Sequence, residues 1–218
     1  MRQQYRTVKK SARIELEEKK SRFIAACRPV GTEAEAQAFL SFERGAYPDA
    51  SHHVYAWVTG GAYSLQRYSD DGEPQGTAGL PVLDVLKHQD LEQVAVVVTR
   101  YFGGTLLGTG GLSRAYGQAA AQAVAAARPV VMRLCREYAV TVSYADHERL
   151  RRAWQQAGWP CSDAAFGIDV DVTVRVPLER DDAFRQLCAD LTGGAALIEL
   201  QQQVYLPLPP PDPPPAQA

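Results

Sequence analysis

Residues 131–206 show the clearest alternation of hydrophobic and polar positions in the chain. Every second residue of IDVDVTVRV (168–176) is apolar, and LCREYAVTVS (134–143) alternates over most of its length. Both segments are therefore predicted to be strands. A short strand is expected near 160–166, before a turn at Gly167, and ALIELQQQVYL (196–206) is expected to be the last strand.

Two helices are expected between these strands. The first has apolar residues at helical spacing from Leu150 to Ala157; Asp146 is expected to cap it and Gly158 to end it. The second has helical spacing over 184–191 and stops at two glycines. The resulting order, β-α-β-β-α-β, predicts a ferredoxin-like domain over 131–206.

Residues 1–130 predict a second domain of mixed α and β structure, which ends near Arg128-Pro129 because a proline there follows a helix. The helix over 32–44 opens with a capping box formed by Thr32 and Glu35. Gly60-Gly61 predicts a hairpin turn between two of the strands. The strands are expected at 4–10, 21–29, 53–59, 62–69 and 94–99, and the other helices at about 78–88 and 112–127.

The chain ends in PLPPPDPPPAQA (207–218). Prolines lack the amide hydrogen that sheets and helices need, so this segment is predicted to be an extended, disordered tail. We expect its deletion to leave the fold intact.

Composition limits the classes of function. The formal net charge of −2 argues against a strong, sequence-independent nucleic-acid binder, although residues 1–130 carry 15 basic and 13 acidic residues and have room for a local basic patch. No apolar run approaches the roughly 20 residues of a membrane span, and no signal peptide is visible. The four cysteines show no C-x-x-C spacing, which is typical of reduced thiols in a cytoplasmic protein.

A glycine-rich segment, TRYFGGTLLGTGGLSRAY (99–116), joins a predicted strand to a predicted helix. It matches neither the Walker A motif, because Thr109 and Gly110 follow Gly108, nor the dinucleotide fingerprint, because Ser113 takes the place of the third glycine. Its backbone amides, the start of the helix, Arg100 and Arg114 still suit an anion. The alternative is that the glycines let the loop cross closely over another backbone, with Arg100 paired to a carboxylate such as Asp70 or Asp71.

A second loop, SDDGEPQGTAG (69–79), concentrates Asp70, Asp71 and Glu73, and His52 and His53 lie nearby in the sequence. Clustered carboxylates with a histidine suit a divalent metal or acid–base chemistry. The same composition is typical of a turn in which aspartate and glycine shape the backbone. No activated serine or cysteine nucleophile is visible in the chain.

Four segments together resemble the YigZ/Impact family: SRFIA (21–25), SHHVYAW (51–57), SDDGEPQGTAGLPVLDVL (69–86) and VVVTRYFGGTLLGTGGLSRAY (96–116). The resemblance implies a bacterial cytoplasmic protein of two domains. The first would be similar to the ribosomal-protein-S5-domain-2-like fold of domain IV of elongation factor G, and the second to its ferredoxin-like domain V. Domains of these kinds contact the ribosome, and no established catalytic residues accompany the family.

The sequence therefore favours a non-enzymatic, translation-linked protein that binds RNA or the ribosome and needs no cofactor. A protein–protein regulatory module using the same face is the second hypothesis, and a small metal-dependent hydrolase built on His53, Asp70, Asp71 and Glu73 is the third. The predicted anion site comprises Arg100, Tyr101, Gly103, Gly104, Gly108, Gly110, Gly111, Ser113 and Arg114. A possible second loop comprises His53, Asp70, Asp71, Glu73, Gly76 and Thr77.

Overall fold

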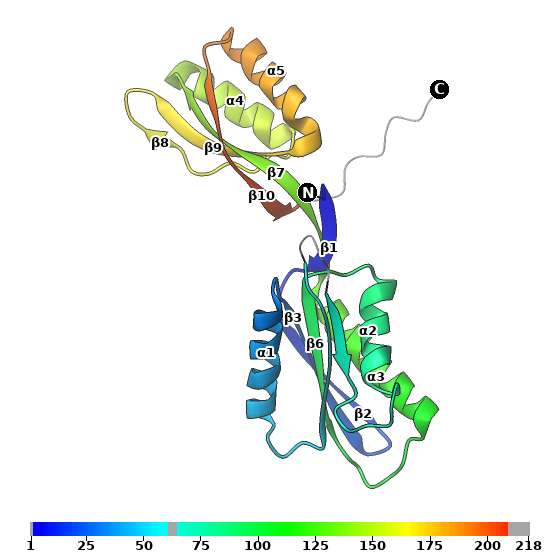
Figure 1. Cartoon of the computed structure of the whole chain (residues 1–218). Helices are drawn as coiled ribbons and strands as arrows, with labels where there is room; N and C mark the ends of the chain where they lie inside the picture. Colours follow the sequence, from blue (N-terminus) through cyan, green and yellow to red (C-terminus); the bar gives the residue numbers. More distant parts are fainter. Residues whose placement is uncertain (1, 61–64, 209–218) are drawn as a thin grey trace, which may run out of the picture. The chain divides into compact units, whose positions relative to one another are not determined.

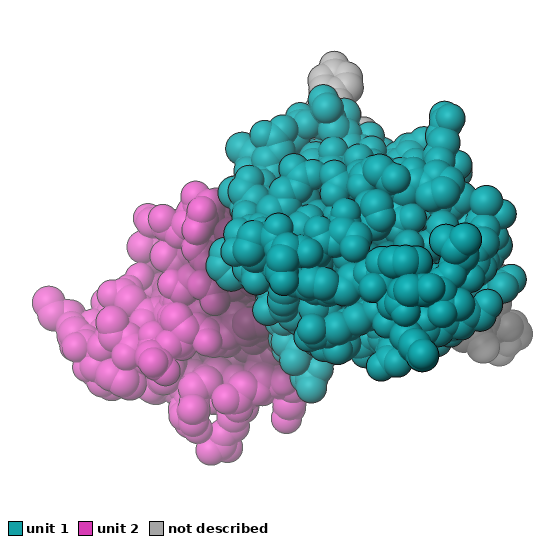
Figure 2. All heavy atoms as spheres, turned by 90° about the horizontal axis from the view of Figure 1, so that it is seen from below, with its two compact units in different colours: residues 1, 5–131 teal, residues 2–4, 132–218 magenta. Residues whose placement is uncertain are grey.

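The computed structural model describes residues 2–60 and 65–208, which form two compact units (Figure 2). The first unit contains residues 5–131, and the second contains residues 2–4 together with residues from 132 onward. Residues 2 and 3 are hydrogen-bonded to the second unit. The amide of Leu134 donates to the carbonyl oxygen of Gln3 (2.8 Å), and the hydroxyl of Tyr205 donates to that of Arg2 (2.6 Å).

The first unit is built on an antiparallel sheet with the strand order β2-β3-β6-β4-β5. The central strand β6 reads VAVVVTRY and is buried over all but its last residue, because helices cover both faces of the sheet. The strands are β2 (Ala12–Glu18), β3 (Ser21–Pro29), β4 (His52–Val58), β5 (Gln66–Ser69) and β6 (Val94–Tyr101).

Helix α1 (Glu33–Ala46) lies on one face of this sheet, and α2 (Gly79–His88) and α3 (Thr109–Ala127) lie on the other (Figure 1). The larger core cluster lies under α2 and α3 and includes Phe23 and Tyr116, whose rings meet edge to face. The smaller cluster lies under α1. The predicted cap of α1 is confirmed, since the Thr32 hydroxyl accepts the amide hydrogen of Glu35 (3.2 Å).

Strand β2 was not predicted from the sequence. It pairs with β3 through a turn at Lys19 and Lys20, which have φ angles of +46° and +66°. Such hairpin turns usually contain asparagine or glycine, so the two lysines gave no turn signal. Strand β5 begins at Gln66, and the predicted Gly60-Gly61 turn extends outside the described residues.

The second unit has the strand order β10-β7-β9-β8, with antiparallel pairs throughout. This is the order of a ferredoxin-like domain, so the predicted α+β class is confirmed. Strand β1 (Gln4–Val8) lies beside β7 in the same sheet. The other elements are β7 (Pro129–Val142), α4 (Tyr144–Gln156), β8 (Ala165–Phe166), β9 (Val170–Pro177), a 3₁₀ turn (Leu178–Arg180), α5 (Asp181–Thr192) and β10 (Leu197–Pro207).

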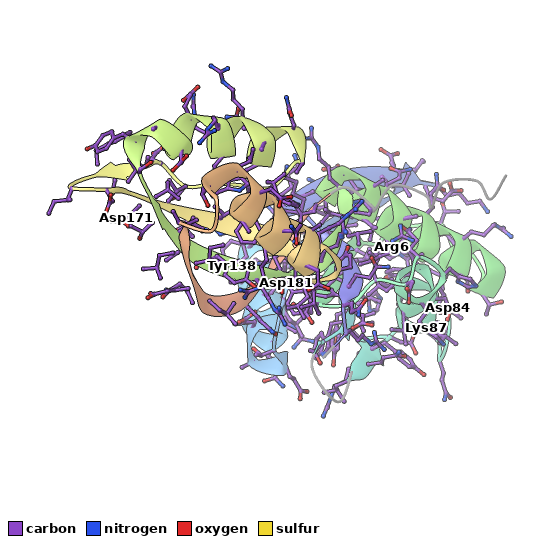
Figure 3. The ribbon with its side chains drawn as sticks, turned by 90° about the horizontal axis from the view of Figure 1, so that it is seen from above. Arg6, Asp84, Lys87, Tyr138, Asp171 and Asp181 are labelled. Atoms are coloured by element: carbon purple, nitrogen blue, oxygen red, sulfur yellow. The ribbon has the colours of Figure 1, made fainter. Side chains whose placement is uncertain are left out.

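The core of the second unit lies between this sheet and helices α4 and α5, and Trp154 and Phe184 are fully buried there. Asp181, at the start of α5, accepts hydrogen bonds from the Tyr138 hydroxyl and from Arg136 (Figure 3). The sequence prediction of the α4 cap was wrong by three residues. Ser143 is the cap, and its hydroxyl accepts the amide hydrogen of Asp146 (3.2 Å), the third residue of the helix.

The predicted proline-rich tail lies mostly beyond the described residues. Pro207 is the last residue of β10, and residues 209–218 of the proline-rich tail lie outside the described residues. No helix among the described residues is both long enough and apolar enough to cross a membrane.

Candidate functional site

The glycine loop (residues 102–108) joins β6 to α3, as the sequence predicts. Gly103 lies against the β2–β3 turn, and a Cβ atom there would be 2.0 Å from the carbonyl carbon of Lys20. Its amide also donates to the hydroxyl of Ser21 (3.2 Å). Only glycine fits this approach, so the prediction that the loop crosses closely over another backbone holds at Gly103.

The loop ends at an N-terminal helix turn with no side-chain cap. Gly108 occupies the cap position with a φ of +71°, which disfavours other residues, and the first turn contains no acidic side chain. The first intrahelical amide, that of Leu112, bonds to the carbonyl oxygen of Gly108 (2.9 Å). The amides of Thr109, Gly110 and Gly111 precede it and point toward the open end of the helix.

The two arginines of the predicted anion site have different surroundings. Arg114 is exposed and forms no ion pair with the described residues. Arg100 is buried, with 5% of its side chain exposed, and its Nη1 atom lies 2.5 Å from Oε1 of Glu73. The sequence suggested Asp70 or Asp71 as its carboxylate partner, and the structure places Glu73 there.

Glu73 links the two loops through a buried network. Its Oε1 atom also accepts the hydroxyl hydrogen of Tyr116 (2.8 Å), and Nη2 of Arg100 donates to Ser21 (3.2 Å). Burial and the neighbouring Glu73 carboxylate raise the pKa of Tyr116 far above its ordinary value, which keeps the hydroxyl proton in place. Tyr116 and Ser21 were not among the predicted site residues.

The surface of the glycine loop combines apolar and basic side chains. Half of Phe102 and 84% of Leu106 are exposed. The neighbouring turn adds Lys19 and Lys20, which are exposed and which sequence reasoning missed because it did not predict the turn. Tyr101 is half-buried, and its hydroxyl donates to Asp49 (3.1 Å).

In the acidic loop, Asp70 acts as a remote cap for α2. Its carboxylate accepts the amide hydrogens of Gly76 (2.8 Å), Ala78 (3.1 Å) and Gly79 (2.8 Å). Helix α2 has no side-chain cap of its own at Ala78, so Asp70 fills that role from outside the helix. Thr77 is buried, and its hydroxyl donates to the carbonyl oxygen of Pro74 (2.6 Å).

Asp71 and the two histidines hold the same loop against the start of β4. The Asp71 carboxylate accepts from Arg44 (2.8 Å) and from the amide of His53 (2.6 Å). Nδ1 of His52 lies 2.9 Å from the carbonyl oxygen of Asp71, and Nε2 of His53 lies 3.1 Å from that of Tyr47. Burial lowers the pKa of His53, which favours its neutral form.

The acidic loop therefore uses its carboxylates to hold the fold. Asp70, Asp71 and Glu73 bind backbone amides, Arg44 and Arg100, and the three do not converge on a common point. Within the described part of the chain, no group of three or more histidine, cysteine, aspartate or glutamate side chains is placed to hold a metal ion. This arrangement lends no support to the hydrolase hypothesis.

Comparisons with known proteins cover both units. A family model described as the Impact N-terminal domain matches residues 19–124, which include both loops, and a domain of unknown function (DUF1949) matches residues 140–195. The IMPACT family member YvyE of Bacillus subtilis is 34% identical over 202 residues, which cover 93% of each chain. The chain belongs to the IMPACT family.

Two further matches agree with this membership. The IMPACT family member YigZ of Escherichia coli is 35% identical over 81% of this chain and 88% of its own. A crystal structure described as that of a hypothetical protein covers 93% of this chain and 99% of its own, with 30% identity and a TM-score of 0.60. The family predicted from the four sequence segments is thus confirmed.

Proposed function

We propose that this IMPACT family member is a non-enzymatic, translation-linked protein that binds the RNA backbone, free or in the ribosome, through the glycine-loop end of its first unit. One observation carries the proposal. The uncapped amides at the start of α3 lie within one helical turn of Arg114, an exposed cation without an ion pair among the described residues. Backbone amides at a helix start and a free guanidinium together suit a phosphate group.

The proposed site differs from the predicted one in its cations. Arg100 is neutralised by Glu73, so its role in the proposal is to hold the loop in place. Lys19 and Lys20 replace it as charges near the loop, since Gly103 lies directly against Lys20. Glu17 and Glu18, at the end of β2 just before these lysines, offset part of this positive charge, which favours modest affinity over strong non-specific binding.

The test is the salt dependence of RNA binding by the wild-type chain and by Arg114→Ala. We expect the substitution to weaken binding about equally for all RNA sequences and to reduce the slope of log K against log salt by about one. Arg67→Ala, which removes the same charge from an arginine paired with Glu33, is the control. Arg67 is exposed and lies away from the glycine loop. It is paired across the sheet with Trp57, and Trp57 is paired with Ala95, near the end of β6 that is distant from the loop. If Arg114→Ala leaves both affinity and slope unchanged, the loop has only a packing role.

A protein partner is the second candidate, and the exposure of Phe102 and Leu106 favours it. Two large exposed apolar side chains in one loop are typical of a protein contact when they lie among polar neighbours. Gradient sedimentation of a cell lysate, followed by the same experiment with Phe102→Ser/Leu106→Ser, separates the two candidates. Under the RNA proposal, the double variant keeps its affinity for naked RNA and still co-sediments with its partner. Under the protein proposal, the double variant no longer co-sediments with its protein partner.

A further inference from the structure

Strand β2 forms an edge of the first unit's sheet. It pairs with β3 on one side, and no described strand pairs with its other side. Ala12, Ile14 and Leu16 lie on the face toward α3 and are only partly buried against the core. An edge of this kind presents unpaired backbone groups and half-covered apolar side chains, and another strand can satisfy both.

The charges along this edge are divided between its two ends. Lys10 precedes the strand, and Arg28 lies on β3 next to position 11, because Ala12 pairs with Cys27. Glu17 and Glu18 lie at the other end. All four are exposed and form no ion pair with the described residues, whereas Arg13 pairs with Glu43 and Glu15 with Arg22.

We infer that β2 pairs antiparallel with β2 of a second copy of this chain, centred on Ile14. A two-stranded antiparallel alignment must keep side chains on matching faces and should pair at least five residues of β2 (12–18). Three alignments meet both conditions, and they are centred on residue 14, 15 or 16. Centring on 15 sets Glu15 against its own copy, and centring on 16 sets Glu15 against the partner's Glu17. Both alignments oppose like charges.

Centring on 14 pairs compatible residues throughout. Ile14 faces its own copy, Ala12 faces the partner's Leu16, and Arg13 faces the partner's Glu15. All of these contacts except the central one occur twice, because a two-fold axis passes through the centre.

The same alignment uses the four unpaired charges. Lys10 faces the partner's Glu18, and the partner's Glu17 faces the small side chain of Ser11, next to Arg28. The basic end of each strand therefore meets the acidic end of the other. The product is one continuous sheet of ten strands, five from each copy.

A charge-swap experiment on the full chain tests this pairing. We expect the wild-type chain to dimerise in sedimentation equilibrium, and both Glu17→Lys/Glu18→Lys and Lys10→Glu/Arg28→Glu to raise the dissociation constant about tenfold or more. An equimolar mixture of the two variants should recover the dimer, because its opposite edges are complementary. Asp84→Lys/Lys87→Glu on α2 (Figure 3) is the control and should dimerise like the wild type.

Cross-linking tests the alignment itself. In a Cys161→Ser background, Ile14→Cys should form a disulfide-linked dimer on mild oxidation. Glu15→Cys faces the partner's Arg13 in this alignment, so it should form at least tenfold less of the disulfide-linked dimer. The dimer proposal is overturned if the wild type stays monomeric up to millimolar concentration. It is equally overturned if both charge variants dimerise like the wild type, or if the mixture stays monomeric. Equal cross-linking by the two cysteine variants overturns the alignment on Ile14.

Discussion

The acidic loop and the glycine loop of the first unit lie next to each other and contrast in how their polar groups are used. In the acidic loop, Asp70, Asp71 and Glu73 all have hydrogen-bond or ion-pair partners within the unit. In the glycine loop and the first turns of α3, the helix-start amides, Arg114 and the side chain of Leu106 face outward. The polar groups of the acidic loop therefore stabilise the fold, whereas those at the glycine loop remain available to bind a partner.

Composition alone suggested chemistry in both loops, and what separates them is whether each polar group already has a partner. Three carboxylates within four residues look like a metal site until each one is traced to its donor. Substitutions in the two loops can therefore test the contrast directly. Those in the acidic network should cost stability, and those on the outer surface of the glycine loop should cost little.

The largest effect is expected for Glu73→Gln. The variant leaves the buried guanidinium of Arg100 without its counter-charge, and breaking a buried ion pair from one side costs about 3–5 kcal/mol. Chemical denaturation gives the free energy of unfolding. Glu33→Gln, which breaks an exposed pair with Arg67, is the control and should cost about 0–1 kcal/mol. Equal losses in the two variants would contradict the proposed role of the network.

Gly103→Ala should be the next most destabilising change. A methyl group at this position overlaps the backbone of Lys20, so the loop or the turn must move, at a cost of about 3 kcal/mol. Gly104→Ala is the matched comparison, because Gly104 has open space around it and a φ of +79°, and the backbone conformation alone costs about 1 kcal/mol. If thermal unfolding ranks the two variants in the opposite order, the close approach at Gly103 is not what fixes the loop.

Asp70→Ala should cost about 2 kcal/mol, the upper end for the loss of a helix cap, because three amides lose their acceptor. Asp70→Asn keeps one oxygen acceptor and should lie between the alanine variant and the wild type. Hydrogen exchange at Ala78 and Gly79 reports on the start of α2 directly. Unchanged protection in Asp70→Ala would show that the cap is dispensable.

The smallest effect on stability is expected for Arg114→Ala, at less than about 0.5 kcal/mol, because the side chain is exposed and unpaired among the described residues. Its RNA affinity should fall nonetheless, as proposed above. A loss of more than 1 kcal/mol in denaturation would place Arg114 with Arg100 as a structural residue and would remove the contrast between the two loops.

The sequence predicted elements whose residues carry a strong periodic signal. Strand β9 alternates almost perfectly, and β6 is a continuous apolar run, so both were predicted. Strand β2 was missed although Ile14 and Leu16 alternate with charged residues, because its turn is made of two lysines in a conformation that asparagine and glycine usually adopt. Local sequence carries no information about a turn that tertiary packing imposes.

The local form of the glycine-rich segment could be predicted from the sequence, but the surroundings of its arginines could not. A glycine-rich stretch before a helix indicates an anion site, and the start of α3 has that form. The sequence could not show that Arg100 is buried and Arg114 is exposed. Arg100 contacts Glu73, which is 27 positions away, and Ser21, which is 79 positions away. Such long-range pairings depend on the fold, and no local pattern records them.

The hydrogen bonds that hold residues 2–4 to the second unit also bear on the order in which the chain matures during synthesis. Arg2 and Tyr205 are 203 positions apart, and a ribosome adds about 5–20 residues per second, so Arg2 waits on the order of 10–40 s for its partner. Residues 2–4 are made long before β10 and therefore reach their native contacts only after β10 has been made. Residues 5–131 can complete their own core within that interval, and the second unit closes only when the end of β10 has been made.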